Sequence, residues 1–136
     1  MKDRIILMKV ESYLKRIQRN YDLIKDLNEK EILNLDESFA LTQFITNVHS
    51  LIYNISNDGI AEKMIIAVGR GLITCRHISS HDYDSLDWSR VKVLCRKLLS
   101  DNTKNVLEDC IKIAEEDEKK NTDYTHVIKS NIIDND

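Results

Sequence analysis

Residues 6–27 read ILMKVESYLKRIQRNYDLIKDL, and this stretch points to the fold class. Its apolar side chains recur at steps of three and four residues, which places them on one face of a helix. The repeating positions are Ile6, Val10, Tyr13, Leu14, Ile17, Tyr21, Ile24 and Leu27. The pattern predicts an amphipathic first helix from about Lys2 to Leu27, followed by a connection from Asn28 to Asn34.

The next part of the chain continues the helical spacing. Asp36 is expected to cap a second helix, whose broad apolar face reaches Ile55 and suggests burial against several helices or a partner chain. Residues 56–59 (Ser-Asn-Asp-Gly) form the clearest turn in the sequence. A third helix is expected after this turn, running from Ile60 into Arg76.

Two further helices are expected in the last third of the chain. Asp87 or Ser85 can cap a fourth helix, and a polar break at residues 100–103 separates it from a fifth. The charged residues beyond the fifth helix predict a frayed end. We therefore expect one domain over residues 1–118 and a polar C-terminal tail over residues 119–136.

The composition supports an all-α fold. The 136 residues include no proline and only three glycines, so few chain breakers interrupt long helices. Hydrophobic residues make up 42% and charged residues 32%, which is a globular balance. No segment alternates with period two. The sequence predicts a four- to five-helix up-and-down bundle.

The sequence also predicts a cytoplasmic location. No apolar run approaches the roughly 20 residues that cross a bilayer. The N-terminus becomes polar again at Lys9, too soon for the core of a signal peptide. Cys75, Cys95 and Cys110 are too widely spaced for a metal or redox motif, and their odd number argues against a disulfide framework. We expect three reduced, mostly buried thiols.

The positive charge gathers in the middle of the chain. The net charge is −3, which argues against a nucleic-acid binder held by bulk positive charge. The stretch from Arg70 to Lys97, however, contains six basic residues and only three acidic ones. It also contains His77 and His81. Any anion site is therefore expected in the middle third of the chain.

Residues 76–83 read RHISSHDY. They interrupt the apolar pattern with an arginine, two histidines, two serines and a tyrosine, whose side chains can take part in catalysis. On an ideal helix Arg76 and His81 would lie about 140° apart. Either the helix ends before His81, or the site is completed across a dimer. Arg76 and Tyr83, seven positions apart, share a face more naturally.

An arginine and a histidine are sufficient for RNA cleavage without a metal ion or other cofactor. Histidine titrates near neutrality, so it can remove the proton of a 2′-hydroxyl. Arginine stays protonated and offers two parallel hydrogen bonds to phosphate oxygens. Attack of the 2′-oxygen on the adjacent phosphorus would leave a 2′,3′-cyclic phosphate. Arg76 and His81 are the candidate catalytic pair.

Arg76-x4-His81-x-Tyr83 resembles the signature of the HEPN superfamily, in the form found in its HepT-type ribonuclease toxins. The resemblance covers most of the chain, including the amphipathic first helix, the Phe/Leu-rich second helix and the Leu-Asp start of the helix after the motif. The sequence departs from the usual pattern at His77, where asparagine is most common, and at Cys75, where a larger apolar residue is more typical.

The resemblance implies a HEPN-type bundle acting as an endoribonuclease toxin. It implies a homodimer with both motifs lining a cleft, and a partner: a minimal nucleotidyltransferase antitoxin that transfers AMP onto Tyr83. Added negative charge and bulk at Tyr83 would oppose RNA binding. Arg70, His77 and Ser80 are further candidates for contacts with the substrate.

Two other functions remain open at the level of sequence. In the first, the chain is a HEPN-type subunit that binds nucleotide or substrate for a nucleotidyltransferase and does not cut RNA. In the second, it is a structural bundle in which the motif is incidental. In the second case Arg76 and His81 occupy a solvated helix end, where cations are favoured.

Single histidines and the tryptophan have simpler interpretations. His77, His81 and Asp84 have metal-ligand spacing only if the helix runs through all three, and no fourth ligand suggests itself, so no metal site is predicted. His49, on an apolar helix, is more consistent with a packed or interface histidine. Trp88 could stack on a base, but its place at a helix start favours a core anchor.

Overall fold

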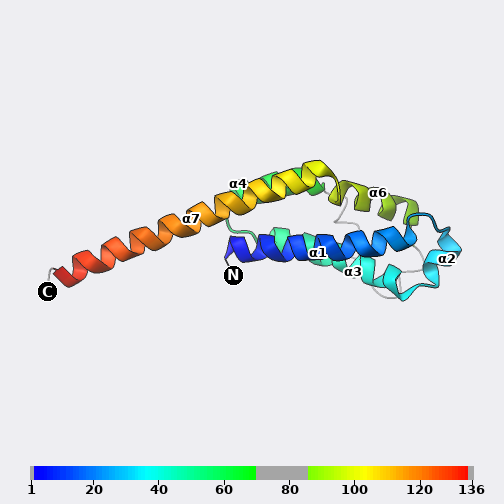
Figure 1. Ribbon diagram of the computed structural model, residues 1–136, viewed down its shortest axis with the longest axis horizontal. Coiled ribbons are helices and arrows are strands. Elements are labelled where there is room, and N and C mark those ends of the chain that lie inside the picture. Colours follow the sequence, from blue (N-terminus) through cyan, green and yellow to red (C-terminus); the bar gives the residue numbers. More distant parts are fainter. Residues whose placement is uncertain (1, 70–85, 135–136) are drawn as a thin grey trace.

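The computed structural model describes residues 2–69 and 86–134, with side chains described as far as Lys120. This described part contains six α-helices and no strand (Figure 1). The all-α prediction is therefore confirmed. Within these ranges no helix is long and apolar enough to cross a membrane.

Helix α1 (Asp3–Ile24) occupies the centre of the fold and packs most extensively against α3 (Asp36–Tyr53). The buried face of α1 contains most of the residues that its periodicity predicts. The residues buried on this face are Ile6, Leu7, Val10, Leu14, Ile17, Asn20 and Ile24. Because α1 also contacts the last two helices of the chain, its apolar face is shared among several neighbours.

A short helix, α2 (Glu29–Leu33), lies where the sequence predicted only a connection. The Asn28 side chain caps it: Oδ1 accepts from the Glu31 N–H at 2.9 Å, and Nδ2 donates to the Glu31 carboxylate at 2.8 Å. Ile32 is fully buried. Five residues are too few to show helical periodicity, so the cap and one buried isoleucine define this helix instead.

The predicted cap of the second helix was wrong. Asp36 is the first residue of α3, Leu35 occupies the N-cap position, and no side chain caps this end. Asp36 and Glu37 still favour the helix start, since acidic residues in the first turn face the positive end of the helix dipole.

The third predicted helix ends earlier than expected. Helix α4 (Asp58–Val68) begins at the predicted turn, with the Asn57 side chain accepting from the Ile60 N–H at 3.1 Å. It stops at Gly69 instead of running into Arg76. Gly69 has φ 78° and ψ 162°, a backbone conformation that is open essentially only to glycine.

Helices α6 (Trp88–Leu98) and α7 (Asp101–Asp134) follow one another with a short break. The predicted cap of α6 is confirmed, because Asp87 Oδ1 accepts from the backbone N–H groups of Ser89 and Arg90. At the break, the buried Thr103 hydroxyl donates to the Lys97 carbonyl at 2.8 Å, and Ser100 Oγ accepts from the Thr103 N–H.

The C-terminal residues do not fray as expected. Helix α7 continues to Asp134, and its last part extends past the other helices in Figure 1. The polar composition of this end misled the prediction, since a charged helix needs no buried face where it leaves the bundle. The proposed division between residues 1–118 and 119–136 stays a prediction.

The helices form two layers (Figure 1). One layer is the α1–α3 pair, and the other contains α4 packed against α7, with α6 ahead of α7. The core between them is aliphatic. Its fully buried side chains include Leu7, Ile17, Leu41, Ile45, Met64 and Leu98. The described part contains six helices where the sequence predicted four to five, and α2 is the helix that the sequence did not predict.

Replacement of Gly69 by alanine should destabilise the fold. The positive φ would strain any side chain, and a Cβ would lie 2.8 Å from Lys97 Nζ. We expect the free energy of unfolding in urea to fall by about 1–3 kcal/mol. Gly59→Ala is the matched control, because a Cβ there meets only Asn57 Oδ1 at 3.3 Å. Equal stability of the two variants would contradict the backbone assigned to Gly69.

Candidate functional site

The residues that the sequence singles out for chemistry share one segment. Arg76, His81 and Tyr83 lie between residues 70 and 85, outside the described residues. The same holds for the candidate substrate contacts, which are Arg70, His77 and Ser80, and for Cys75 and Asp84. The structure describes the two ends to which this segment is joined, at Gly69 and Leu86.

The first end is held at Gly69. Its N–H donates to the Ile65 carbonyl at 2.7 Å, which closes the last turn of α4. The Lys97 side chain of α6 lies against this glycine. The end of α4 is therefore adjacent to the end of α6.

The second end is held at Leu86 and Asp87. Asp87 caps α6, and the next residue, Trp88, is only 3% exposed. Trp88 belongs to the hydrophobic core, so its interpretation as a core anchor is confirmed and base stacking is not available to it. A capped, tryptophan-anchored helix start gives the segment a firm attachment to the bundle.

A cation of α6 also ties that helix to α1. Lys92 Nζ donates to the Leu27 carbonyl at 2.8 Å, just beyond the end of α1. A positive charge is favourable there, because carbonyls past a helix C-terminus lack intrahelical partners. The other three basic side chains of α6, Arg90, Arg96 and Lys97, are exposed.

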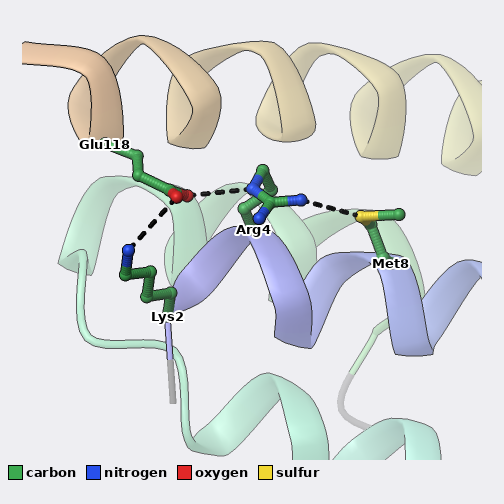
Figure 2. A network of polar contacts seen from close by, with 4 residues as sticks. All are labelled: Lys2, Arg4, Met8 and Glu118. Carbon is green, nitrogen blue, oxygen red and sulfur yellow. Dashed lines mark hydrogen bonds and ion pairs between the residues drawn. The ribbon is translucent and has the colours of Figure 1, made fainter.

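A polar network joins the start of α1 to α7 (Figure 2). Glu118 accepts from Arg4 Nε at 2.9 Å and from Lys2 Nζ at 3.2 Å, and Arg4 Nη1 contacts Met8 Sδ at 3.4 Å. The hydrogen bond from Arg4, followed by that from Lys2, lowers the pKa of Glu118 below its ordinary value. A carboxylate held between two cations is a structural clamp and not an acid–base catalyst at neutral pH.

Beside this network, Asp3 holds the turn between α3 and α4. Its carboxylate accepts from the backbone N–H groups of Ser56 and Asn57, at 2.9 and 3.0 Å, and from the Ser56 hydroxyl. Asn57 in turn donates to Asp117 of α7 at 3.2 Å. Burial raises the pKa of Asp3, but the hydrogen bonds from Ser56 and Asn57 outweigh it, so the pKa lies below its ordinary value.

A cavity of about 440 Å³ lies between α1 and the junction of α6 with α7. Its lining combines leucines with equal numbers of acidic and basic side chains. The leucines are Leu14, Leu98, Leu99 and Leu107, and the charged residues are Glu11, Lys15, Lys104 and Glu108. Among the described residues that line it there is no histidine, cysteine or hydroxyl side chain.

The remaining titratable residues have structural roles. No three potential metal ligands gather anywhere in the described residues. Cys95 and Cys110 are buried free thiols, as expected, and burial raises the pKa of Cys110. His49 is 4% exposed and lies edge-on to Tyr53, with ring centroids 4.3 Å apart. The packed histidine of the sequence interpretation is confirmed.

Comparisons with family models, curated proteins and solved structures find no match to this chain.

Replacement of Asp3 by asparagine should change how stability depends on pH. A carboxyl whose pKa is lowered by folding stabilises the native state above its unfolded pKa, and this contribution is lost as the pH falls through the folded pKa. The ordinary pKa of this carboxyl, which applies to the unfolded chain, is 3.8. We expect Asp3→Asn to unfold at lower urea than wild type at neutral pH, with the difference shrinking below about pH 4.

The matched control is Asp26→Asn. Asp26 is exposed and its carboxylate makes no hydrogen bond or ion pair with the described residues. Its replacement should leave the pH profile unchanged. A constant difference between Asp3→Asn and wild type across the acid range would show that the Asp3 carboxylate does not titrate with folding.

Proposed function

We propose that this protein is a metal-independent endoribonuclease toxin, with Arg76 and His81 as its catalytic pair. The observation that carries the proposal is the motif Arg76-x4-His81-x-Tyr83, which follows α4 and precedes α6 in an all-α chain. The motif resembles that of HepT-type toxins of the HEPN superfamily. The described bundle supports the proposal by giving this segment one attachment at Gly69 and another at Leu86.

The proposed reaction uses only the RNA and these two side chains. The neutral imidazole of His81 takes the proton of a 2′-hydroxyl, and the 2′-oxygen forms a bond to the adjacent phosphorus. The bond from phosphorus to the 5′-oxygen breaks, and that oxygen takes up the proton that His81 had accepted, which leaves the imidazole neutral again. Arg76 donates hydrogen bonds to the phosphate oxygens, whose negative charge grows in the transition state. The products carry a 2′,3′-cyclic phosphate and a 5′-hydroxyl.

The expected assembly is a homodimer with two motifs at a shared cleft. A dimer would remove the geometric difficulty that Arg76 and His81, five positions apart, do not share one face of a regular helix. The expected partner is a minimal nucleotidyltransferase antitoxin. By placing AMP on Tyr83, it would put a negative phosphodiester where an RNA phosphate must bind.

Cleavage should require both motif residues and no metal. Wild-type protein incubated with total cellular RNA in EDTA is expected to cut it and to leave cyclic phosphate ends. Arg76→Ala and His81→Ala should each slow cleavage by about 10²–10⁴-fold, because each removes one catalytic contribution. The measurement is the rate of product formation, with phosphate ends identified by mass spectrometry.

The matched control is His126→Ala, which removes a histidine outside the motif and should cut at the wild-type rate. Cleavage that stops in EDTA would contradict the metal-independent mechanism. Cleavage that survives in His81→Ala would remove that residue from the catalytic pair. RNA binding without any cleavage would favour the non-cutting subunit.

Tyr83 should be the site of AMP addition. After incubation with ATP and a nucleotidyltransferase encoded beside this chain, the intact mass is expected to rise by AMP units, and RNA cleavage should stop. Tyr83→Phe keeps the ring and removes the acceptor oxygen, so it should gain no mass and should stay active. An equal mass gain in Tyr83→Phe would place the modification elsewhere.

A further inference from the structure

The exposed face of α6 is rich in basic residues. Arg90, Arg96 and Lys97 are exposed, and Val93 between them is 56% exposed. At 100° per residue these side chains fall within about 120° of the helix circumference. The helix contains no acidic residue, although the whole chain has a net charge of −3. Positive charge is thus concentrated here against the overall balance.

The charged groups on this face have no partner in the described structure. The guanidinium groups of Arg90 and Arg96 make no hydrogen bond or ion pair with any described residue. The same is true of the ammonium group of Lys97. Asp87 is close in sequence, but its carboxylate accepts from backbone N–H groups.

Several other cations of the described residues are engaged. Exposed ones such as Lys9, Arg19 and Lys112 are not, but their helices, α1 and α7, also contain acidic residues, whereas α6 contains none. Lys2 and Arg4 bind Glu118, and Lys25 lies 3.6 Å from Asp22. Arg16 lies over aromatic rings, and Lys92 of α6 itself donates to a carbonyl. Three unpaired cations on one side of one helix create a positive field available to an external anion.

The position of this basic face relates it to the candidate site. Lys97 lies against Gly69, where the motif segment leaves α4, and Arg90 lies one turn beyond Leu86, where the segment rejoins the bundle. Arg90 and Lys97 are separated by about 10 Å along the helix axis. That distance corresponds to about three nucleotide steps of a stacked strand.

We propose that Arg90, Arg96 and Lys97 form a docking surface for the phosphate backbone of single-stranded RNA, which they hold beside the motif segment. This inference rests on the proposed RNA substrate. The three residues are positioning residues, since nothing places them at the reacting atoms. Separate charges spread along a helix suit a chain of regularly spaced phosphates better than one small anion.

Binding of a short, fluorescently labelled 2′-O-methyl RNA strand tests this surface without cleavage. The variant is Arg90→Ala/Arg96→Ala/Lys97→Ala. The matched control is Lys9→Ala/Arg19→Ala/Lys112→Ala, which removes three exposed charges from α1 and α7. Anisotropy is measured between about 50 and 200 mM salt. Urea unfolding of both variants confirms that they fold.

We expect the α6 variant to bind about 10- to 100-fold more weakly than wild type. The slope of log K against log salt should fall by about 2, since each lost single-strand phosphate contact contributes about 0.7. The control should bind almost as wild type. Equal affinity and slope in both variants would overturn the docking surface while leaving the proposed nuclease intact.

Two further outcomes separate this inference from the proposed function. If wild type binds RNA through α6 but cleaves none, the surface stands and the nuclease proposal fails. If the α6 variant keeps its RNA affinity but loses binding to polyglutamate, the face recognises an acidic protein and the RNA surface is overturned. A wild type that binds no RNA overturns both.

Discussion

The burial of one face of α1 is the constraint on which the rest of the structure depends. This face packs against α3 along most of its length and also contacts α6 and α7, so it joins the two layers of the bundle. Each fully buried isoleucine or leucine contributes about 1.5–3 kcal/mol relative to exposure, and Ile6, Leu7, Ile17 and Ile24 are all in this class. Helix α4 also contacts three other helices, but less extensively than α1 does.

Polar contacts fix the ends of helices that hydrophobic burial alone leaves free to slide. At one end of α1, Asp3 holds the turn before α4, and Glu118 of α7 holds Lys2 and Arg4. At the other end, Lys92 of α6 bonds to the Leu27 carbonyl. These bonds are directional, so they select one register among the many that an aliphatic interface would tolerate.

The bundle, with its helices fixed in one register, holds both ends of the motif segment. The segment leaves the described structure at a glycine whose backbone ends α4, and it rejoins at a capped helix anchored by Trp88. Helix α6 turns one face to the core and the other to solvent, and three cations on the exposed face have no partner among the described residues. The proposed chemistry belongs to Arg76 and His81, and the proposed RNA-docking face belongs to α6.

The sequence by itself determined the helical class, the buried face of α1, the cap at Asp87 and the core position of Trp88, because each depends on local spacing or a single side chain. It also supplied the motif on which the proposed function rests. It did not reveal α2, where five residues are too short for a periodic signal, nor the end of α4, where apolar residues continue past Gly69. Only the tertiary structure decided that Lys92 of α6 is engaged, because its partner, the Leu27 carbonyl, lies 65 residues away in the chain.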